Sequence, residues 1–205
     1  MKKGKFIVFE GPDRSGKTTQ INLLAKWLRK KKIKFILTRE PGGTKLSERL
    51  RALLLNPKNK MCPLTELFLY EASRAQHVKE LILPSLESGK IVISDRFTLA
   101  SCAYQGYGRK IPVKTVKMLN KIATENLKPD ITFVLNIPDK FFVRRRDTSG
   151  ADRIESESSK FRKEVNKAYK ILGERENLTV INAGDTINNI HRKIIKVIST
   201  RIGIV

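Results

Sequence analysis

Histidine and cysteine are scarce in this chain of 205 residues, which contains two of each. The cysteines, Cys62 and Cys102, lie far apart and lack the spacing of a metal site. Because two such thiols do not form a disulfide framework, they favour a reducing compartment, and we expect a cytoplasmic protein. The histidines, His77 and His191, are too few for a histidine-rich metal centre.

Long apolar runs are also missing. No segment approaches the roughly 20 apolar residues that are needed to span a bilayer, so we expect no membrane partner. The first apolar stretch follows a basic beginning and is cut short by Glu10 and Gly11. This pattern indicates a buried first strand and argues against a secretory signal.

Acidic residues are outnumbered, with 20 Asp and Glu against 42 Lys and Arg, which gives a net charge of +22 and a pI near 10.2. Such an excess attracts polyanions, among them nucleic acids and polyphosphate substrates. The alternative is a solvated, lysine-rich surface. The basic residues are spread along the chain, and the sequence has neither a basic tail nor an RNA-binding aromatic signature. We therefore expect no specific binding of nucleic acid.

A phosphate-binding loop is the most specific motif that is present. The segment GPDRSGKT, from Gly11 to Thr18, has the spacing G-x-x-x-x-G-K-[ST] between an apolar run and a helical pattern. Its backbone N–H groups can face phosphate oxygens, while Lys17 reaches the β- and γ-phosphates and Thr18 places a hydroxyl on Mg²⁺. We predict binding of ATP or GTP by Gly11, Pro12, Asp13, Arg14, Ser15, Gly16, Lys17, Thr18 and Thr19.

Around this loop, short β-branched runs alternate with longer segments of helical periodicity. We predict strands at residues 5–9, 33–38, 91–95, 131–137 and 178–182. We predict helices at residues 17–31, 46–55, 99–105, 112–125 and 186–200, and a helical region at 63–89 that Pro84 kinks or breaks. This order predicts one domain, residues 1–205, with a three-layer α/β P-loop NTPase fold. We expect a five-stranded parallel sheet with helices on both faces and a small lid.

Asp95 and Arg96 stand at the carboxyl end of the third predicted strand, where ligands bind in open parallel sheets. Asp95 can orient the shell of a Mg²⁺ ion, and Arg96 can grip a phosphate with its planar guanidinium. The alternative is an ion pair that caps the next helix. The neighbouring phosphate-binding loop favours the functional interpretation.

Two aromatic segments can belong to either a site or the core. Tyr70 and Arg74 are four residues apart and share a helix face, where they could sandwich a planar base. Gln105 carries the amide groups that could read a base edge. The competing interpretation assigns the apolar and aromatic members to the core: Leu67, Tyr70, Leu81 and Tyr104.

A polar, glycine-containing segment at about residues 144–156 resembles a mobile lid. Its arginines, Arg144, Arg145, Arg146 and Arg153, suit the stabilisation of a phosphoryl group in transit. Alternatively, they form a solvated helix face. At least one of the three consecutive arginines must point away from a site, because a helix turns by about 100° per residue.

The ordered set VFEGPDRSGKTTQ, TREPGGT, LRALLL, YEASRAQHV, ISDRF, SCAYQG and DRIE resembles the thymidylate kinase family. The resemblance implies transfer of the ATP γ-phosphoryl group to dTMP in dTTP synthesis, with Mg²⁺, by a homodimer. Another acceptor, dUMP or a purine nucleotide, is the near alternative. A P-loop ATPase that binds nucleic acid is the distant one, and the N-K-x-D string of a GTP switch is missing.

The resemblance also implies roles for individual residues. Asp13 faces the sugar 3′-hydroxyl, Tyr104 crowds the 2′ position, Arg96 holds the acceptor phosphate, and Arg144 stacks on adenine. Tyr70 replaces a phenylalanine that packs on thymine, and its hydroxyl needs a partner. The full acceptor set is Asp13, Glu40, Arg51, Tyr70, Arg74, Arg96, Ser101, Tyr104 and Gln105.

Arg14 suggests where the donor for the transferred phosphoryl group lies. Members of the family carry an arginine either in the phosphate-binding loop or inside the lid. Here Arg14 is in the loop, and Thr148 occupies a lid position that arginine often fills. We expect Arg14 to be that donor, although Arg146 and Arg153 offer alternatives. The predicted catalytic set is Arg14, Lys17, Asp95, Arg96, Arg146 and Arg153, with Thr18 and Asp95 at the metal.

Overall fold

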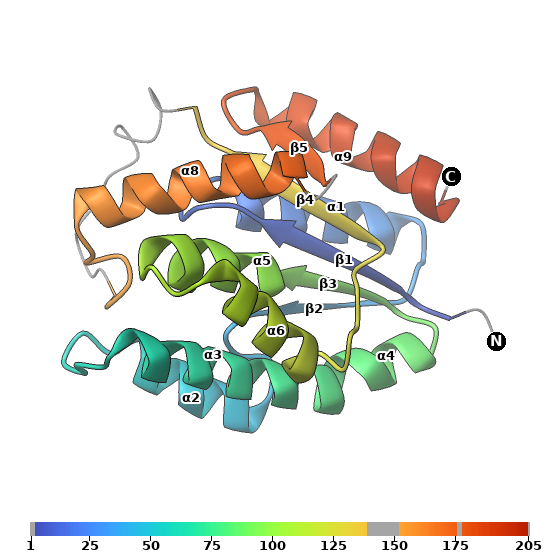
Figure 1. Ribbon diagram of the computed structural model, residues 1–205. Helices are drawn as coiled ribbons and strands as arrows, with labels where there is room; N and C mark the ends of the chain where they lie inside the picture. The colour runs from blue at the N-terminus through green and yellow to red at the C-terminus, as the bar shows by residue number, and fades with distance from the viewer. Residues whose placement is uncertain (1–2, 139–151, 176–177, 205) are drawn as a thin grey trace.

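The computed structural model describes residues 3–138, 152–175 and 178–204 (Figure 1). The lid predicted at 144–156 is therefore described only from residue 152 onward. The predictions made for Arg144, Arg145, Arg146 and Thr148 lie outside the described residues.

Five parallel strands form a single sheet in the order β2-β3-β1-β4-β5, which confirms the predicted sheet. The central strand β1 pairs with β3 on one side and β4 on the other, so that Phe9 lies opposite Asp95 and Phe133. The carboxyl ends of β1 and β3 thus bring the phosphate-binding loop beside Asp95. The strands are β1 Lys5–Glu10, β2 Phe35–Arg39, β3 Ile91–Asp95, β4 Ile131–Asn136 and β5 Thr179–Asn182.

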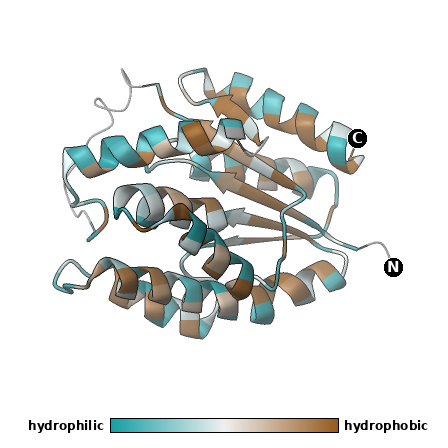
Figure 2. Ribbon diagram, in the orientation of Figure 1, coloured by the Kyte–Doolittle hydropathy of each residue, from teal (hydrophilic) through white to brown (hydrophobic). Residues whose placement is uncertain are grey.

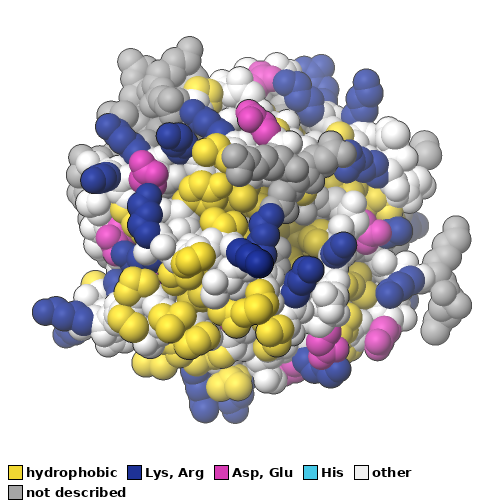
Figure 3. All heavy atoms as spheres, viewed as in Figure 1, with side chains coloured by type: hydrophobic (Ala, Val, Ile, Leu, Met, Phe, Trp, Pro, Cys, Tyr) yellow, Lys and Arg dark blue, Asp and Glu magenta, His cyan; other side chains and the backbone are white. Residues whose placement is uncertain are grey.

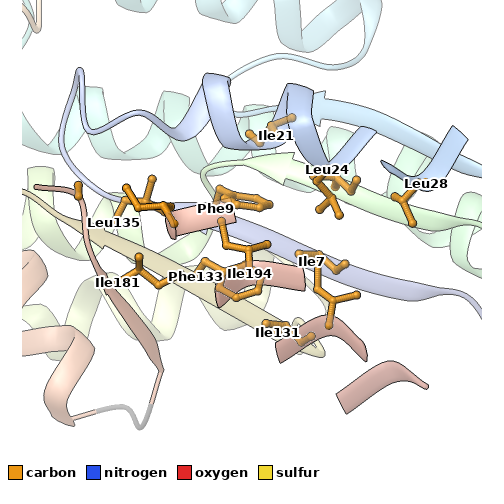
Figure 4. Packing of buried hydrophobic residues seen from close by; sticks show 14 of the residues in the cluster. Ile7, Phe9, Ile21, Leu24, Leu28, Ile131, Phe133, Leu135, Ile181 and Ile194 are labelled. Carbon is orange, nitrogen blue, oxygen red and sulfur yellow. The ribbon is translucent and has the colours of Figure 1, made fainter. Parts of the chain in front are cut away.

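Helices cover both faces of the sheet, and alternate strand residues face opposite layers. Ile7 and Phe9 of β1 pack with α1 and α9, whereas Phe6 and Val8 pack with the layer that contains α4. Figure 2 shows the apolar strands in the centre of the molecule, and Figure 4 shows the packing of α1 and α9 side chains on one face. The three-layer α/β prediction is therefore confirmed.

The helix at Ser159–Arg175 has no counterpart among the predicted helices. Each other helix matches a predicted helical region to within a few residues, except where π-helical turns intervene. Two segments adopt π-helical geometry, η1 Val78–Ile82 and η2 Cys102–Gly108. Among the described residues, no helix is both long and apolar enough to cross a membrane. The helices are α1 Lys17–Lys30, α2 Lys45–Leu55, α3 Pro63–His77, α4 Leu83–Glu87, α5 Thr98–Ser101, α6 Val113–Ala123, α8 Ser159–Arg175 and α9 Ile187–Ile202.

The π-helical turns refine two predictions. The break expected at Pro84 begins earlier, at η1, because the proline ring clashes with the carbonyl of Glu80 in a regular helix and the wider turn relieves that clash. The helix predicted at 99–105 is the short α5 followed by η2. Within η2, a Cβ on Gly108 would lie 2.5 Å from the Phe161 ring, so glycine allows η2 to approach α8.

Candidate active site

The phosphate-binding loop turns sharply between β1 and α1. Gly11 has φ +138°, and a Cβ there would meet the Leu135 carbonyl oxygen at 2.6 Å. Gly16 has φ +93° just before the first residue of α1. Both positions require glycine for their backbone conformation, which is the physical basis of the motif. Arg14 also lies in the left-handed region, with φ +62°, and its side chain is exposed.

Lys17 is buried against the loop that it follows. Its ammonium group donates hydrogen bonds to the carbonyl oxygens of Gly11 and Pro12, both at 3.1 Å, and lies 4.0 Å from Asp95 Oδ1. Burial and the positive charge of Arg96 lower the pKa of Lys17 to about 8, although the carboxylate of Asp95 opposes this shift. The loop thus contains a cation held on backbone oxygens.

Thr18 and Asp95 meet beside Lys17. Thr18 Oγ1 lies 3.5 Å from Asp95 Oδ2, while Asp95 Oδ1 is buried and has no hydrogen-bond partner. A hydroxyl and an unsatisfied carboxylate oxygen are hard oxygen ligands of the kind that Mg²⁺ prefers. The part of the chain that the structure describes has no cluster of three or more His, Cys, Asp or Glu residues for a metal. The pair therefore fits an ion that takes its remaining ligands from phosphate and water.

Arg96 follows β3 and is held by several protein groups at this edge of the sheet. Its backbone lies at φ +73°, which is costly for a residue with a side chain. Nη1 donates to the Gly11 carbonyl and the Tyr169 hydroxyl, each at 3.0 Å, and Nη2 donates to Asp13 and to the Tyr104 hydroxyl. The guanidinium also lies over the Tyr104 ring, 5.0 Å from its centroid.

Asp13 connects the phosphate-binding loop to this arginine. Besides its ion pair with Arg96, it accepts a hydrogen bond from the Tyr104 hydroxyl at 2.8 Å. Burial alone would raise the pKa of Asp13, but the charges of Arg96 and Lys17 outweigh burial and lower it. Asp13 is thus a carboxylate that retains its charge at neutral pH.

One pocket brings together all nine residues of the predicted acceptor set, which come from the phosphate-binding loop, the β2–α2 turn, α2, α3, the end of β3, α5 and η2. Tyr70 is half-buried in the wall of this pocket, and its expected contact with a base stays a prediction. The lining residues are Asp13, Glu40, Pro41, Arg51, Leu55, Tyr70, Arg74, Arg96, Ala100, Ser101, Tyr104, Gln105, Asp152 and Ile154.

Arg74 is buried at the base of this pocket and is fully hydrogen-bonded. Nε donates to Glu40 at 2.8 Å, and Nη1 donates to Glu71 at 2.5 Å and to Asn120 at 2.7 Å. Nη2 donates to the Phe97 carbonyl at 3.2 Å and to Ser101 Oγ at 3.0 Å. Because a guanidinium has five N–H donors, a contact from Arg74 to a base requires the exchange of one of these bonds.

Glu40 and Arg51 also line the pocket. Glu40 accepts from Arg74 and lies 3.0 Å from His77 Nδ1, which anchors the turn that follows β2. Burial would raise the pKa of Glu40, but the Arg74 charge and the contact with His77 lower it. Arg51 donates to the Pro41 carbonyl at 2.9 Å. These contacts hold both side chains in place through protein groups alone.

Glu66 accepts hydrogen bonds from Gln105 and from two arginines near it. This buried carboxylate accepts from Gln105 Nε2 at 2.8 Å, from Arg109 Nη2 at 2.9 Å and from Arg153 Nη1 at 2.6 Å. Arg153 also donates to the Leu54 carbonyl at 2.7 Å. Arg153 thus contacts α2 and α3, and its expected catalytic role stays a prediction.

Sequence reasoning missed several residues of this network. Glu10 and Tyr169 contact each other behind Arg96, while Glu66, His77 and Asn120 hold pocket residues. Only Glu10 carried a local signal, since it is a charged residue at the end of a buried apolar strand. The roles of the other residues depend on contacts between segments that are distant in the sequence, so no local pattern predicts them.

Comparison with known proteins shows which family and which solved structures the chain resembles. The family described as thymidylate kinase matches residues 9–194. A thymidylate kinase of Prochlorococcus marinus (strain NATL2A) is 47% identical over 97% of this chain and 100% of its own length. One from Fervidobacterium nodosum is 46% identical over 94% of this chain and 97% of its own. The crystal structure of thymidylate kinase from Ehrlichia chaffeensis superposes with a TM-score of 0.78 at 35% identity, covering 96% of this chain and 99% of that one.

Proposed function

The chain belongs to the thymidylate kinase family, and from this premise we propose how its residues transfer the γ-phosphoryl group of ATP to dTMP to give dTDP and ADP. The observation that carries the proposal is the single pocket that contains all nine predicted acceptor residues and includes Asp13 of the phosphate-binding loop. In this arrangement the loop contacts both substrates.

On the donor side, we assign the triphosphate to the loop from Gly11 to Thr19. Lys17 is already held over the loop by backbone carbonyls, and on binding it exchanges these for β- and γ-phosphate oxygens. The residues that would hold Mg²⁺ are Thr18 and Asp95. When bound, the ion neutralises charge on the phosphate oxygens.

On the acceptor side, we propose that Arg96 binds the phosphate of dTMP and that Tyr70 packs on the thymine. Asp13 and Tyr104 are hydrogen-bonded to each other at 2.8 Å, so a single unit faces the sugar. Asp13 accepts a hydrogen bond from the 3′-hydroxyl, and the Tyr104 ring leaves little room for a 2′-hydroxyl. Specificity for deoxyribose follows from this pairing.

The transfer itself needs positioning and charge neutralisation, because the attacking oxygen already belongs to a phosphate. No general base is required. Lys17 and Arg14 stabilise the negative charge that develops on the transferred phosphoryl group, and Arg96 holds the attacking phosphate in line. Arg146 lies outside the described residues and stays a predicted further donor.

The acceptor is tested by measuring ADP formation with ATP and, in turn, dTMP, dUMP, dGMP and AMP. We expect dTMP to give the highest kcat/KM. A higher kcat/KM for dUMP or a purine nucleotide would show that this nucleotide, and not dTMP, is the preferred acceptor. Activity with none of the four, together with salt-sensitive binding of DNA, would favour the P-loop ATPase instead.

We also propose a homodimer that buries an apolar face of α2, α3 and α6. Each of these helices exposes two large apolar side chains at helical spacing, and Figure 3 shows apolar side chains gathered on this side of the molecule. The six residues are Leu46, Leu53, Leu64, Phe68, Met118 and Ile122. Sedimentation equilibrium of the wild type and of Phe68→Glu tests this, with a dimer and a weakened dimer expected; a monomeric wild type would refute it.

The cellular setting follows from the same proposal. Neither cysteine forms a disulfide, with Cys62 exposed and Cys102 buried, which suits a reducing cytoplasm. We assign the excess of basic residues to the surface and to the polyphosphate substrates, without a specific nucleic-acid partner.

A further inference from the structure

Two buried residues that carry no predicted role stand directly behind Arg96. Glu10 is the last residue of β1, and Tyr169 lies in the middle of α8; both side chains are fully buried. The Tyr169 hydroxyl lies 3.0 Å from Glu10 Oε2 and 3.0 Å from Arg96 Nη1. The hydroxyl therefore joins α8, the central strand and the proposed phosphate-binding arginine.

The direction of these hydrogen bonds is fixed by chemistry. A guanidinium has only donors, so the Tyr169 oxygen must accept from Arg96. The single hydroxyl proton is then left for Glu10, which accepts it. Burial raises the pKa of Tyr169, which keeps the hydroxyl protonated. Exchange of either partner leaves a buried polar group unsatisfied or turns the hydroxyl away from Arg96.

Glu10 is itself anchored to the backbone that carries the acceptor pocket. Its Oε1 accepts from the N–H groups of Phe97 at 2.8 Å and Ala100 at 3.2 Å, at the start of α5. The charged groups that act on this carboxylate are Arg96 and Lys17. Burial raises the pKa of Glu10 to about 7 against their influence.

Arg96 needs such support because its backbone is strained and its guanidinium is shared among several acceptors. Asp13 and Tyr104 hold Nη2 on the pocket side, where a ligand competes for them. The Tyr169 hydroxyl holds Nη1 and is buried away from solvent. It is thus a contact that can persist when the pocket is filled.

We propose that Tyr169 is a positioning residue for the phosphoryl acceptor: with Glu10 as its anchor, it orients the Arg96 guanidinium toward the phosphate of dTMP. This inference rests on the proposed role of Arg96 as the acceptor-phosphate ligand. It predicts that loss of the hydroxyl weakens binding of the phosphate and leaves binding of the nucleoside intact.

Isothermal titration of dTMP and of thymidine to each variant tests this. Tyr169→Phe should weaken dTMP binding by about 10-fold and thymidine binding by less than about 2-fold, since the loss of one hydrogen bond to a charged group has this size. Tyr107→Phe is the matched control, because this tyrosine packs in the same core cluster and its hydroxyl bonds to neither Arg96 nor Glu10. It should leave both affinities unchanged.

If Tyr169→Phe folds poorly, Glu10→Gln provides a second variant in which the ratio of dTMP affinity to thymidine affinity can be measured. An unchanged ratio of dTMP to thymidine affinity in both variants, or an equal loss of both affinities, would overturn the proposal. Arg96→Ala separates this failure from that of the underlying assignment. If Arg96→Ala lowers the ratio and the other two variants do not, only the positioning role fails; if Arg96→Ala leaves the ratio unchanged, both fail.

Discussion

At the residue scale, the site depends on side chains whose charges are fixed by their neighbours. Asp13 stays ionised because Arg96 and Lys17 outweigh the effect of burial on its pKa, and it joins the loop to the acceptor pocket. Arg74 has all five N–H donors engaged by protein groups. The pocket is thus organised by the protein itself, which reduces the ordering needed on binding.

Arg14 is predicted from its position in the sequence and in the structure to stabilise the transition state. It is exposed on the loop beside Lys17 and is proposed to act on the phosphoryl group in transit. Arg14→Ala should lower kcat by more than about 10-fold with little change in the KM of dTMP, because the contact forms mainly in the transition state. Steady-state kinetics decide this. An unchanged kcat would return the role to Arg146 or Arg153.

Glu10 predicts a pH dependence of stability. Its pKa is raised from 4.5 to about 7 by burial, so the folded state binds the proton more tightly than the unfolded state does. Stability from this group is present below pH 4.5 and is lost as pH rises through about 7, by about 3 kcal/mol. Urea denaturation of the wild type and of Glu10→Gln should show the variant gaining relative stability between pH 5 and pH 8. A pH-independent difference would contradict the account.

At the scale of elements, the sheet was predictable and the π-helical turns were not. The strands are short β-branched runs bounded by turns, so their positions follow from local pattern. The segments η1 and η2 show the same apolar spacing as ordinary helix, and only packing against other elements selects the wider turn. Most acceptor residues were found through family motifs, whereas Tyr169 escaped because its partner Glu10 is 159 residues away.

The close approach of η2 to α8 depends on Gly108. A Cβ there would lie 2.5 Å from the ring of Phe161, which is itself packed under Arg109. Gly108→Ala should therefore lower the free energy of unfolding by about 1–3 kcal/mol, as overpacking does. Denaturation of Gly108→Ala alone and combined with Phe161→Ala measures this. A penalty of the same size in the Phe161→Ala background would show that the ring is not its cause.

At the scale of the whole molecule, three layers place the two proposed substrate sites at one edge of one sheet. The phosphate-binding loop leaves the central strand, and the acceptor pocket is built from segments that follow β2, β3 and the loop itself. The sequence predicted this edge because parallel strands bring their carboxyl ends together. It could not predict the hydrogen-bonded supports behind the pocket, since these join segments that are distant along the chain.

The central claim is that this edge couples ATP to dTMP, and the most direct measurement quantifies ADP and dTDP in the same reaction. We predict equal amounts of the two products, formed only when dTMP is present, and neither product from Lys17→Ala. Formation of ADP at the same rate without dTMP, and without dTDP, would contradict the account and identify the chain as an uncoupled ATPase.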